Sequence, residues 1–280
     1  MKRRDAFGAL AAVAVGSAMF PRAADGMRAP GRVRQSVSRW CYSRIPLDDL
    51  CTAAKGMGIA AIDLLDEKDW EVPKKHGLTC AMANGFGSIA KGFNRPDNHD
   101  KLVADGERMI PLAAAAGVPN IVCFSGNRAG ISDSEGLVNC VAGLKRLAPT
   151  AEKHGVTLAL ELLNSRVDHK DYQADHTDWG VQVVLGVGSP RVKLLYDIYH
   201  MQIMDGNVIA TIKANAQHIV HYHTGGVPGR NEIDETQELN YRRVTQAIAD
   251  TGFTGFLAHE FVPRRDPLTS LRQAADICTV

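Results

Sequence analysis

The stretch HGVTLALELLNSR, residues 154–166, contains the pattern that decides the fold. Gly155 follows a helix-compatible stretch and tolerates the positive φ angle with which many helices end. The apolar run that comes next has a leucine at every second position, which is the period of a β-strand. Glu161 lies on the face opposite those leucines, close to the carboxyl end of the run. The stretch therefore predicts a strand with an apolar outer face and a carboxylate that points inward.

The same order of strand, helix and glycine turn repeats along the chain. Short β-rich runs occur at residues 33–40, 60–65, 78–83, 120–124, 156–163, 192–197, 218–224 and 256–261. Helix-compatible stretches lie between them, at residues 47–57, 100–116, 134–154, 178–185, 209–214 and 241–250. Strands that alternate with helices form parallel sheets, and no GxGxxG motif supports a dinucleotide-binding domain. Eight units in about 250 residues predict a single-domain α/β protein, a (β/α)8 TIM barrel over residues 35–280.

The first 24 residues have the composition of an export signal. Three basic residues, Lys2, Arg3 and Arg4, precede an apolar stretch at 6–20. This stretch is shorter than the ~20 residues of a membrane span, and no stop-transfer pattern follows it. The arginine pair is similar to that of a twin-arginine signal, which predicts an exported or periplasmic protein with a linker at residues 25–34. A disordered basic N-terminus is the alternative.

The composition of the chain narrows the class of partner. The formal net charge is +1, whereas a nucleic-acid-binding face needs clustered basic residues. No second apolar stretch is long enough for a membrane span, so no membrane association is expected once the signal is removed. We therefore expect a small-molecule partner and no nucleic acid, and the composition is compatible with a homo-oligomer. The six cysteines include no CxxC pair.

Four potential metal ligands lie near the carboxyl ends of the last four apolar runs. They are Glu161, Asp197, His223 and Glu260. In a parallel barrel these ends meet at one face, where active sites form. Three carboxylates and one imidazole make an oxygen-rich site that suits one Mg²⁺ or Mn²⁺ ion, with Co²⁺ as an alternative. The competing interpretation is that each side chain separately forms a salt bridge or caps a helix.

Longer motifs surround these four residues. They are ELLNSR at 161–166, YDIYHMQIMDGN at 196–207, HYHTGGVPGRNE at 221–232, LNY at 239–241 and HEFVPR at 259–264. With these motifs the chain resembles the hydroxypyruvate isomerase family of the xylose isomerase-like barrel superfamily. The resemblance implies that the four residues bind the metal and that Glu161 and Glu260 also transfer protons. It departs at His223, where isomerases of this family often have glutamine and related ketose 3-epimerases have histidine.

Several further residues are candidates for substrate binding. By the resemblance, His200 and Arg230 match substrate-contacting positions, and a guanidinium suits a substrate carboxylate. Asn164 is expected to orient Glu161 or to contact substrate. The alternatives are a helix-start histidine for His200 and a solvated surface arginine for Arg230. We expect His221 to lie in the core or behind the ligands, His218 and His259 to be structural, and Trp40 to form a wall of the pocket.

The residues predict an isomerase that acts on an α-hydroxy carbonyl compound through an enediolate. Two carboxylates beside one metal ion could remove and return a carbon-bound proton. The resemblance implies conversion of hydroxypyruvate to tartronate semialdehyde. A ketose 3-epimerase or another sugar isomerase on the same site is the main alternative, and a non-catalytic exported sugar-binding protein is another. A metal-dependent apurinic endonuclease on this barrel would need more histidine ligands and a basic face.

Overall fold

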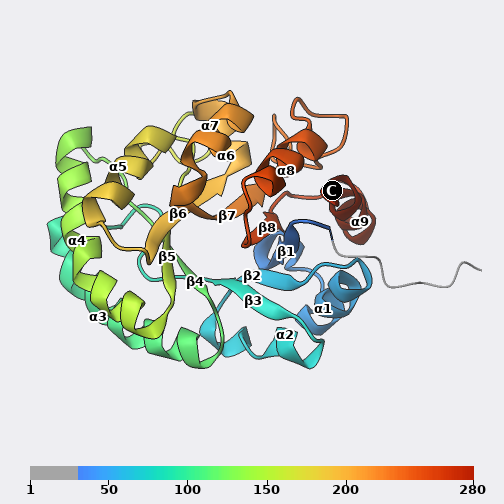
Figure 1. Cartoon of the computed structure of the whole chain (residues 1–280), viewed down its shortest axis with the longest axis horizontal. Helices are drawn as coiled ribbons and strands as arrows, with labels where there is room; N and C mark the ends of the chain where they lie inside the picture. Colours follow the sequence, from blue (N-terminus) through green and yellow to red (C-terminus); the bar gives the residue numbers. More distant parts are fainter. Residues whose placement is uncertain (1–30) are drawn as a thin grey trace, which may run out of the picture.

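Eight parallel strands form a closed barrel in the computed structural model, which describes residues 31–280 (Figure 1). Each strand pairs with its neighbours in chain order, and the last pairs with the first. The strands are β1 Arg34–Ser38, β2 Ala61–Leu65, β3 Thr79–Ala83, β4 Asn120–Cys123, β5 Thr157–Glu161, β6 Val192–Asp197, β7 Ile219–Thr224 and β8 Phe256–His259. The predicted (β/α)8 barrel is confirmed. The predicted export signal at residues 1–24 lies outside the described residues.

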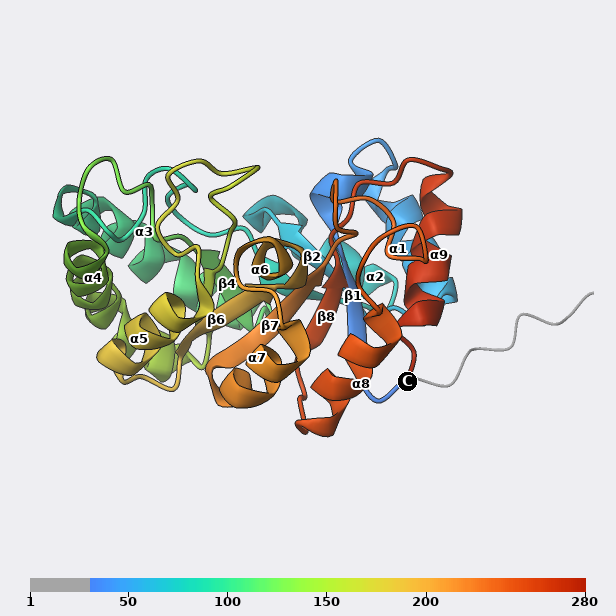
Figure 2. The same ribbon diagram turned by 90° about the horizontal axis from the view of Figure 1, so that it is seen from above.

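Helices lie around the outside of the strands. They are α1 Leu47–Gly56, α2 Val72–Lys75, α3 Pro96–Ala115, α4 Asp133–His154, α5 Thr177–Val187, α6 Ile198–Met204, α7 Val208–Asn215, α8 Tyr241–Asp250 and α9 Pro267–Ile277, with short 3₁₀ turns η1 Arg39–Tyr42, η2 Glu67–Asp69 and η3 Ala216–His218. Figure 2 shows the barrel turned by 90°, with α3, α4 and α5 at one end and α1 and α9 at the other. None of the helices described is long and apolar enough to cross a membrane.

Three of the strand predictions were too long by two residues or more. The predicted run 33–40 contains β1 and then the η1 turn, so the strand ends at Ser38. The run 156–163 ends as a strand at Glu161, and the run 256–261 ends at His259. Arg34, which was assigned to the linker, is already the first residue of β1. Apolar composition continues beyond β5 and β8 because the residues that directly follow these two strands are also buried.

Three helices were not predicted: α2, α6 and α9. The helix α6 starts directly after Asp197, which caps it by accepting a hydrogen bond from the backbone N–H of His200. No linker separates β6 from α6, because Asp197 is both the last residue of the strand and the N-cap of the helix. The helix α9 begins at Pro267 behind Asp266, whose side chain accepts from the Thr269 N–H. Proline at the first turn after an aspartate cap is a recognisable helix start.

The strands have distinct inner and outer faces. Leu158 and Leu160 of β5 belong to the large outer core between strands and helices. The intervening residue, Ala159, packs inside the barrel in a small apolar cluster with Met82, Val122 and Leu195. The predicted alternation in β5 and β6 is therefore confirmed, and it directs Glu161 and Asp197 toward the barrel interior.

Close backbone packing at Gly85 gives a test of this fold. A Cβ atom at Gly85, which follows β3, would lie 1.7 Å from the carbonyl oxygen of Val122 in β4. Backbone cannot move away as a side-chain end can, so we expect Gly85→Ala to lower the free energy of unfolding by at least about 1–3 kcal/mol. Thermal and urea unfolding measure the change. Gly56→Ala is the control, because a Cβ there meets no atom within 4 Å; equal stability of the two variants would contradict the packing.

Candidate active site

The barrel brings the four predicted metal ligands together. Glu161 ends β5, Asp197 ends β6, His223 lies near the end of β7, and Glu260 directly follows β8. All four side chains are buried, the most exposed being Glu161 at 5%. One ligand atom from each residue lies within 4.8 Å of the other three. The strand ends therefore supply the convergence that a single ion requires.

The imidazole of His223 is the centre of this cluster. Its Nδ1 atom lies 2.7 Å from Oε2 of Glu260 and 3.4 Å from Oε1 of Glu161. Among the described residues, neither ring nitrogen has a partner in hydrogen-bond geometry. A buried polar atom without a partner usually indicates an ion or water. Since the other three ligands are carboxylates, the donor set fits Mg²⁺ or Mn²⁺.

Burial and neighbouring charges shift the pKa values of the cluster residues in different directions. Burial raises the pKa of the Asp197 carboxyl, although Arg230 opposes this shift. Burial acts in the same direction on Glu260, but His223 and Arg230 outweigh it and hold the pKa of Glu260 well below its usual value. Burial lowers the pKa of His223, yet the carboxylates, Glu260 first, bring it well above its ordinary value. A group of buried carboxylates that stabilises positive charge in this way is suited to a cation.

Arg230 lies directly against two of the ligand carboxylates. Its Nη2 donates to Oε2 of Glu260 at 2.6 Å and to Oδ2 of Asp197 at 3.0 Å. The guanidinium also lies 5.3 Å from the ring centres of Trp40 and Tyr199. It was predicted to contact substrate; the structure places it on the cavity wall and in the ion pairs of the site. The predicted surface alternative does not describe it, because its side chain is 15% exposed.

His200 and Asn164 lie behind Asp197. The Asn164 amide Nδ2 is 2.6 Å from Nδ1 of His200, whose Nε2 faces Oδ2 of Asp197 at 3.5 Å. Both side chains are fully buried, and neither lines the cavity described next. Burial, followed by Arg230, keeps the pKa of His200 well below its ordinary value. His200 is the helix-start histidine of the alternative interpretation, since it lies in the first turn of α6. Substrate contact by His200 or Asn164 stays a prediction, and so does the orientation of Glu161 by Asn164.

A cavity of about 500 Å³ opens beside the four ligands. Glu161 and Glu260 form part of its wall, and Trp40 does as predicted. The rest of the lining was not predicted from the sequence; it consists of Leu64, Asp66, Asn84, Gly85, Gly87, Ile89, Val122, Phe124, Leu163 and His169. Asn84 donates to Oδ1 of Asp66 at 2.7 Å. These two residues directly follow β3 and β2, so the rule that barrel sites form at strand ends would have found them.

A cavity of similar volume at the opposite mouth of the barrel has no acidic or imidazole side chains among its described lining residues. It has a volume of about 520 Å³ and lies at the amino ends of the strands, next to Arg34 and Thr157. The cavity beside Glu161 and Glu260 is therefore the candidate active site.

A family model described as "Xylose isomerase-like TIM barrel" matches residues 65–279. The chain belongs to this family. The predicted resemblance to the xylose isomerase-like superfamily is thereby confirmed.

Curated relatives within the family are named as isomerases. A putative hydroxypyruvate isomerase of Homo sapiens is 29% identical over 170 residues, 59% of this chain and 61% of the relative. A hydroxypyruvate isomerase of Escherichia coli is 29% identical over 200 residues, 71% of this chain and 77% of the relative. A 2-oxo-tetronate isomerase of Haemophilus influenzae is 27% identical over 243 residues, 82% and 93%. The match therefore spans about three fifths of the human relative and nearly all of the Haemophilus one.

Solved structures support the same architecture. A Brucella melitensis protein titled AP endonuclease, family 2, aligns with a TM-score of 0.78 and 22% identity, over 87% of this chain and 98% of that one. A Clostridium cellulolyticum D-psicose 3-epimerase aligns with a TM-score of 0.68 and 18% identity, over 86% and 89%. At these identities the likeness concerns the fold alone.

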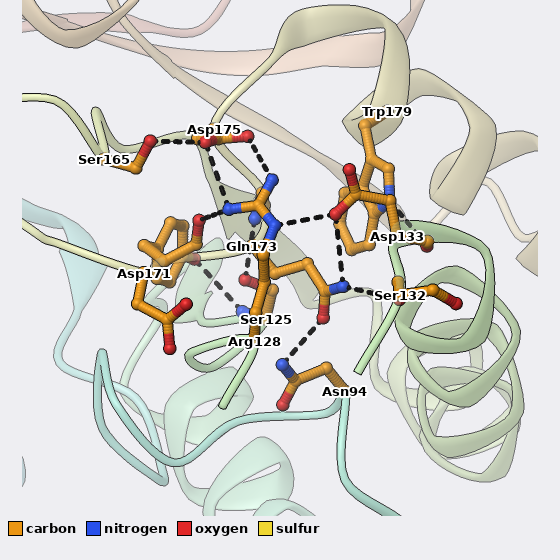
Figure 3. Close-up of polar contacts among 12 residues, drawn as sticks. Asn94, Ser125, Arg128, Ser132, Asp133, Ser165, Asp171, Gln173, Asp175 and Trp179 are labelled. Atoms are coloured by element: carbon orange, nitrogen blue, oxygen red, sulfur yellow. Dashed lines mark hydrogen bonds and ion pairs between the residues drawn. The ribbon is translucent and has the colours of Figure 1, made fainter. Parts of the chain in front are cut away.

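The loops around the active-site mouth of this xylose isomerase-like barrel are tied together by Arg128 (Figure 3). Its guanidinium lies between Asp133 and Asp175, with Nε 2.7 Å from Oδ1 of Asp133 and Nη2 2.9 Å from Oδ1 of Asp175. Gln173 accepts a hydrogen bond from Asn94 at 2.8 Å. The loop after β5, which carries His169, is thereby joined to the loops after β3 and β4. This network holds one wall of the cavity in place.

Proposed function

We propose that the protein is a divalent-metal-dependent isomerase of an α-hydroxy carbonyl compound, similar to hydroxypyruvate isomerase. Its reaction would convert hydroxypyruvate to tartronate semialdehyde. The observation that carries the proposal is the set of four buried ligand atoms beside a cavity at the carboxyl end of the barrel. The names of the curated relatives support the same class of reaction.

The four ligands would hold one ion. Glu161, Asp197, His223 and Glu260 would bind Mg²⁺ or Mn²⁺, with Co²⁺ as the alternative. When bound, such an ion polarises the oxygen atoms of a substrate and stabilises negative charge that develops on them. Arg230 remains paired with Asp197 and Glu260, favours the ionised form of both carboxylates and holds them in place.

Glu161 and Glu260 would transfer the proton. They lie at the ends of β5 and β8, both face Nδ1 of His223, and both line the cavity. For hydroxypyruvate, one carboxylate would take a proton from the hydroxymethyl carbon and the other would deliver one to the former ketone carbon. The hydroxyl proton moves to the neighbouring oxygen, so substrate and product are isomers. Trp40 orients Glu260 by donating from Nε1 to Oε1 at 2.6 Å.

A sugar isomerase or ketose 3-epimerase is the second candidate function, and the size of the cavity favours it. A volume of about 500 Å³ is typical of sites for ligands larger than a three-carbon acid. On its far wall, Asp66 and Asn84 present a carboxylate and an amide, which suit hydroxyl groups. Among the described residues, Arg230 is the only arginine in the lining, and its guanidinium is already paired with two carboxylates.

Hydrogen exchange separates these functions. The purified protein is incubated with Mn²⁺ in deuterated water, with hydroxypyruvate, a tetrulose or a hexulose, and the product is examined by NMR and mass spectrometry. We expect deuterium at a carbon next to a carbonyl, with hydroxypyruvate as substrate if the first proposal holds and a ketose if the second does. A protein that binds Mn²⁺ and sugar but exchanges no proton of any substrate would instead be a sugar-binding protein.

A further inference from the structure

A second buried group lies beneath the four ligands, within the barrel. It consists of Asp63 on β2 and of His221 and His223 on β7, all without exposed surface. Oδ2 of Asp63 is 2.5 Å from Nε2 of His221 and 3.5 Å from Nε2 of His223. We propose that Asp63 is a positioning residue of the metal site, which holds His223 so that its Nδ1 faces the ion. The proposal rests on the metal site of the proposed function.

The two nitrogens of His223 have different surroundings. Nδ1 faces Glu260 and Glu161, at 2.7 Å and 3.4 Å, while the acidic oxygen that faces Nε2 is that of Asp63. A neutral imidazole that offers a lone pair on Nδ1 carries its hydrogen on Nε2. In a site without exposed surface, that N–H needs an acceptor within the protein. Oδ2 of Asp63 lies 3.5 Å from Nε2, outside hydrogen-bond geometry, and a small turn of the ring would make it the acceptor. The carboxylate would then select the form of His223 that can bind a metal.

The burial of Asp63 also requires an explanation. Its Oδ2 lies 2.5 Å from Nε2 of His221 inside the barrel, where burying an ionised carboxylate costs several kcal/mol. Replacement of buried charged groups by apolar residues is often neutral or stabilising, so stability alone does not account for a carboxylate here. A carboxylate that orients a metal-binding histidine is a common arrangement, and its loss typically weakens metal binding 10–100-fold. His221 in turn fixes Asp63.

The barrel interior around Asp63 and His221 has an apolar side and a polar side. On one side the inward residues are apolar, formed by Met82, Val122, Ala159 and Leu195. On the other side Ser38 pairs in register with Asp63, and its Oγ, like Oδ1 of Asp63 and Nδ1 of His221, has no partner in the part of the chain that the structure describes. The polar side lies beneath His223, where an orienting carboxylate would act.

The same three residues do not form a separate metal site. Oδ2 of Asp63 already lies at hydrogen-bond distance from His221. His223 would have to turn one nitrogen to each ion, which leaves no nitrogen for its hydrogen. The group therefore serves to position His223 in the four-ligand site of Glu161, Asp197, His223 and Glu260.

Metal affinity tests the proposal. We expect Asp63→Ala to raise the Kd for Mn²⁺, measured by calorimetry, about 10–100-fold. Asp63→Asn keeps an acceptor oxygen and is expected to show a smaller loss. Ser38→Ala is the matched control, because Ser38 lies in register with Asp63 and its Oγ makes no hydrogen bond to any described residue; its Kd should equal that of the wild type.

NMR gives a second readout that is independent of activity. In ¹⁵N-histidine-labelled protein loaded with Mg²⁺, we expect a slowly exchanging hydrogen on Nε2 of His223, which disappears in Asp63→Ala. A hydrogen on Nδ1, or a folded Asp63→Ala variant with wild-type Mn²⁺ affinity, would overturn the proposal. If that variant fails to fold, unchanged affinity in Asp63→Asn together with a freely exchanging Nε2 hydrogen in the wild type would do so. A wild-type protein that binds no divalent ion would overturn the metal-dependent function as well.

Discussion

Glu260→Gln is expected to abolish most of the proton exchange while the barrel stays folded. Glutamine has the shape of glutamate, so it can still accept the hydrogen bond from Trp40, but it cannot take up a proton from carbon. Proton transfer by a positioned side chain contributes about 10²–10⁴-fold to the rate. We therefore expect deuterium incorporation to fall at least 100-fold at saturating Mn²⁺.

Glu260 is also a predicted ligand, so exchange and metal affinity have to be measured separately. Calorimetry gives the Kd for Mn²⁺, and NMR gives the exchange rate at Mn²⁺ concentrations well above that Kd. Glu235→Gln is the control, since Glu235 is exposed on the loop between β7 and α8. Wild-type exchange by Glu260→Gln under saturating metal would remove Glu260 from the chemistry, whatever its effect on affinity.

Asp197→Asn is expected to weaken Mn²⁺ binding at least 100-fold. The substitution keeps the size of the side chain and an oxygen that can cap α6, but it removes one negative charge from a fully buried site. Two unit charges 4 Å apart interact by about 4 kcal/mol at an effective dielectric constant of 20. That energy corresponds to roughly a thousand-fold in Kd.

The control for this variant is Asp178→Asn, at an exposed position in the first turn of α5. Titration of free Mn²⁺ by electron paramagnetic resonance measures both affinities. Thermal unfolding without metal shows whether Asp197→Asn still folds. If the folded variant binds Mn²⁺ as tightly as the wild type, Asp197 is not a ligand and the site needs another assignment.

The sequence predicted the barrel well because its strands and helices are separated by glycine turns. Gly155 is an example: it ends α4 at a φ of 70° and leads directly into the strand that carries Glu161. No glycine turn lies between β6 and α6. Asp197 is both the last residue of the strand and the N-cap of the helix, so α6 was not separated from β6.

That helix also sets the position of His200. The residue lies in the first turn of α6, as the helix-start alternative has it, with its Nε2 3.5 Å from Oδ2 of Asp197. Asp66 and Asn84 were overlooked because the strands that they directly follow, β2 and β3, carry no predicted metal ligand. Their role depends on which strand ends share one cavity, and that is a property of the closed barrel rather than of either motif.

Closure of the barrel has a consequence for the biosynthesis of this protein. The fourth ligand follows β8, which pairs with β7 on one side and with β1 on the other. A nascent chain that has not yet emerged past residue 260 has two unpaired strand edges and an incomplete ligand set. Such edges favour aggregation until they are covered. Completion of the four-residue cluster is therefore a late event, which follows the joining of the last strand to the first.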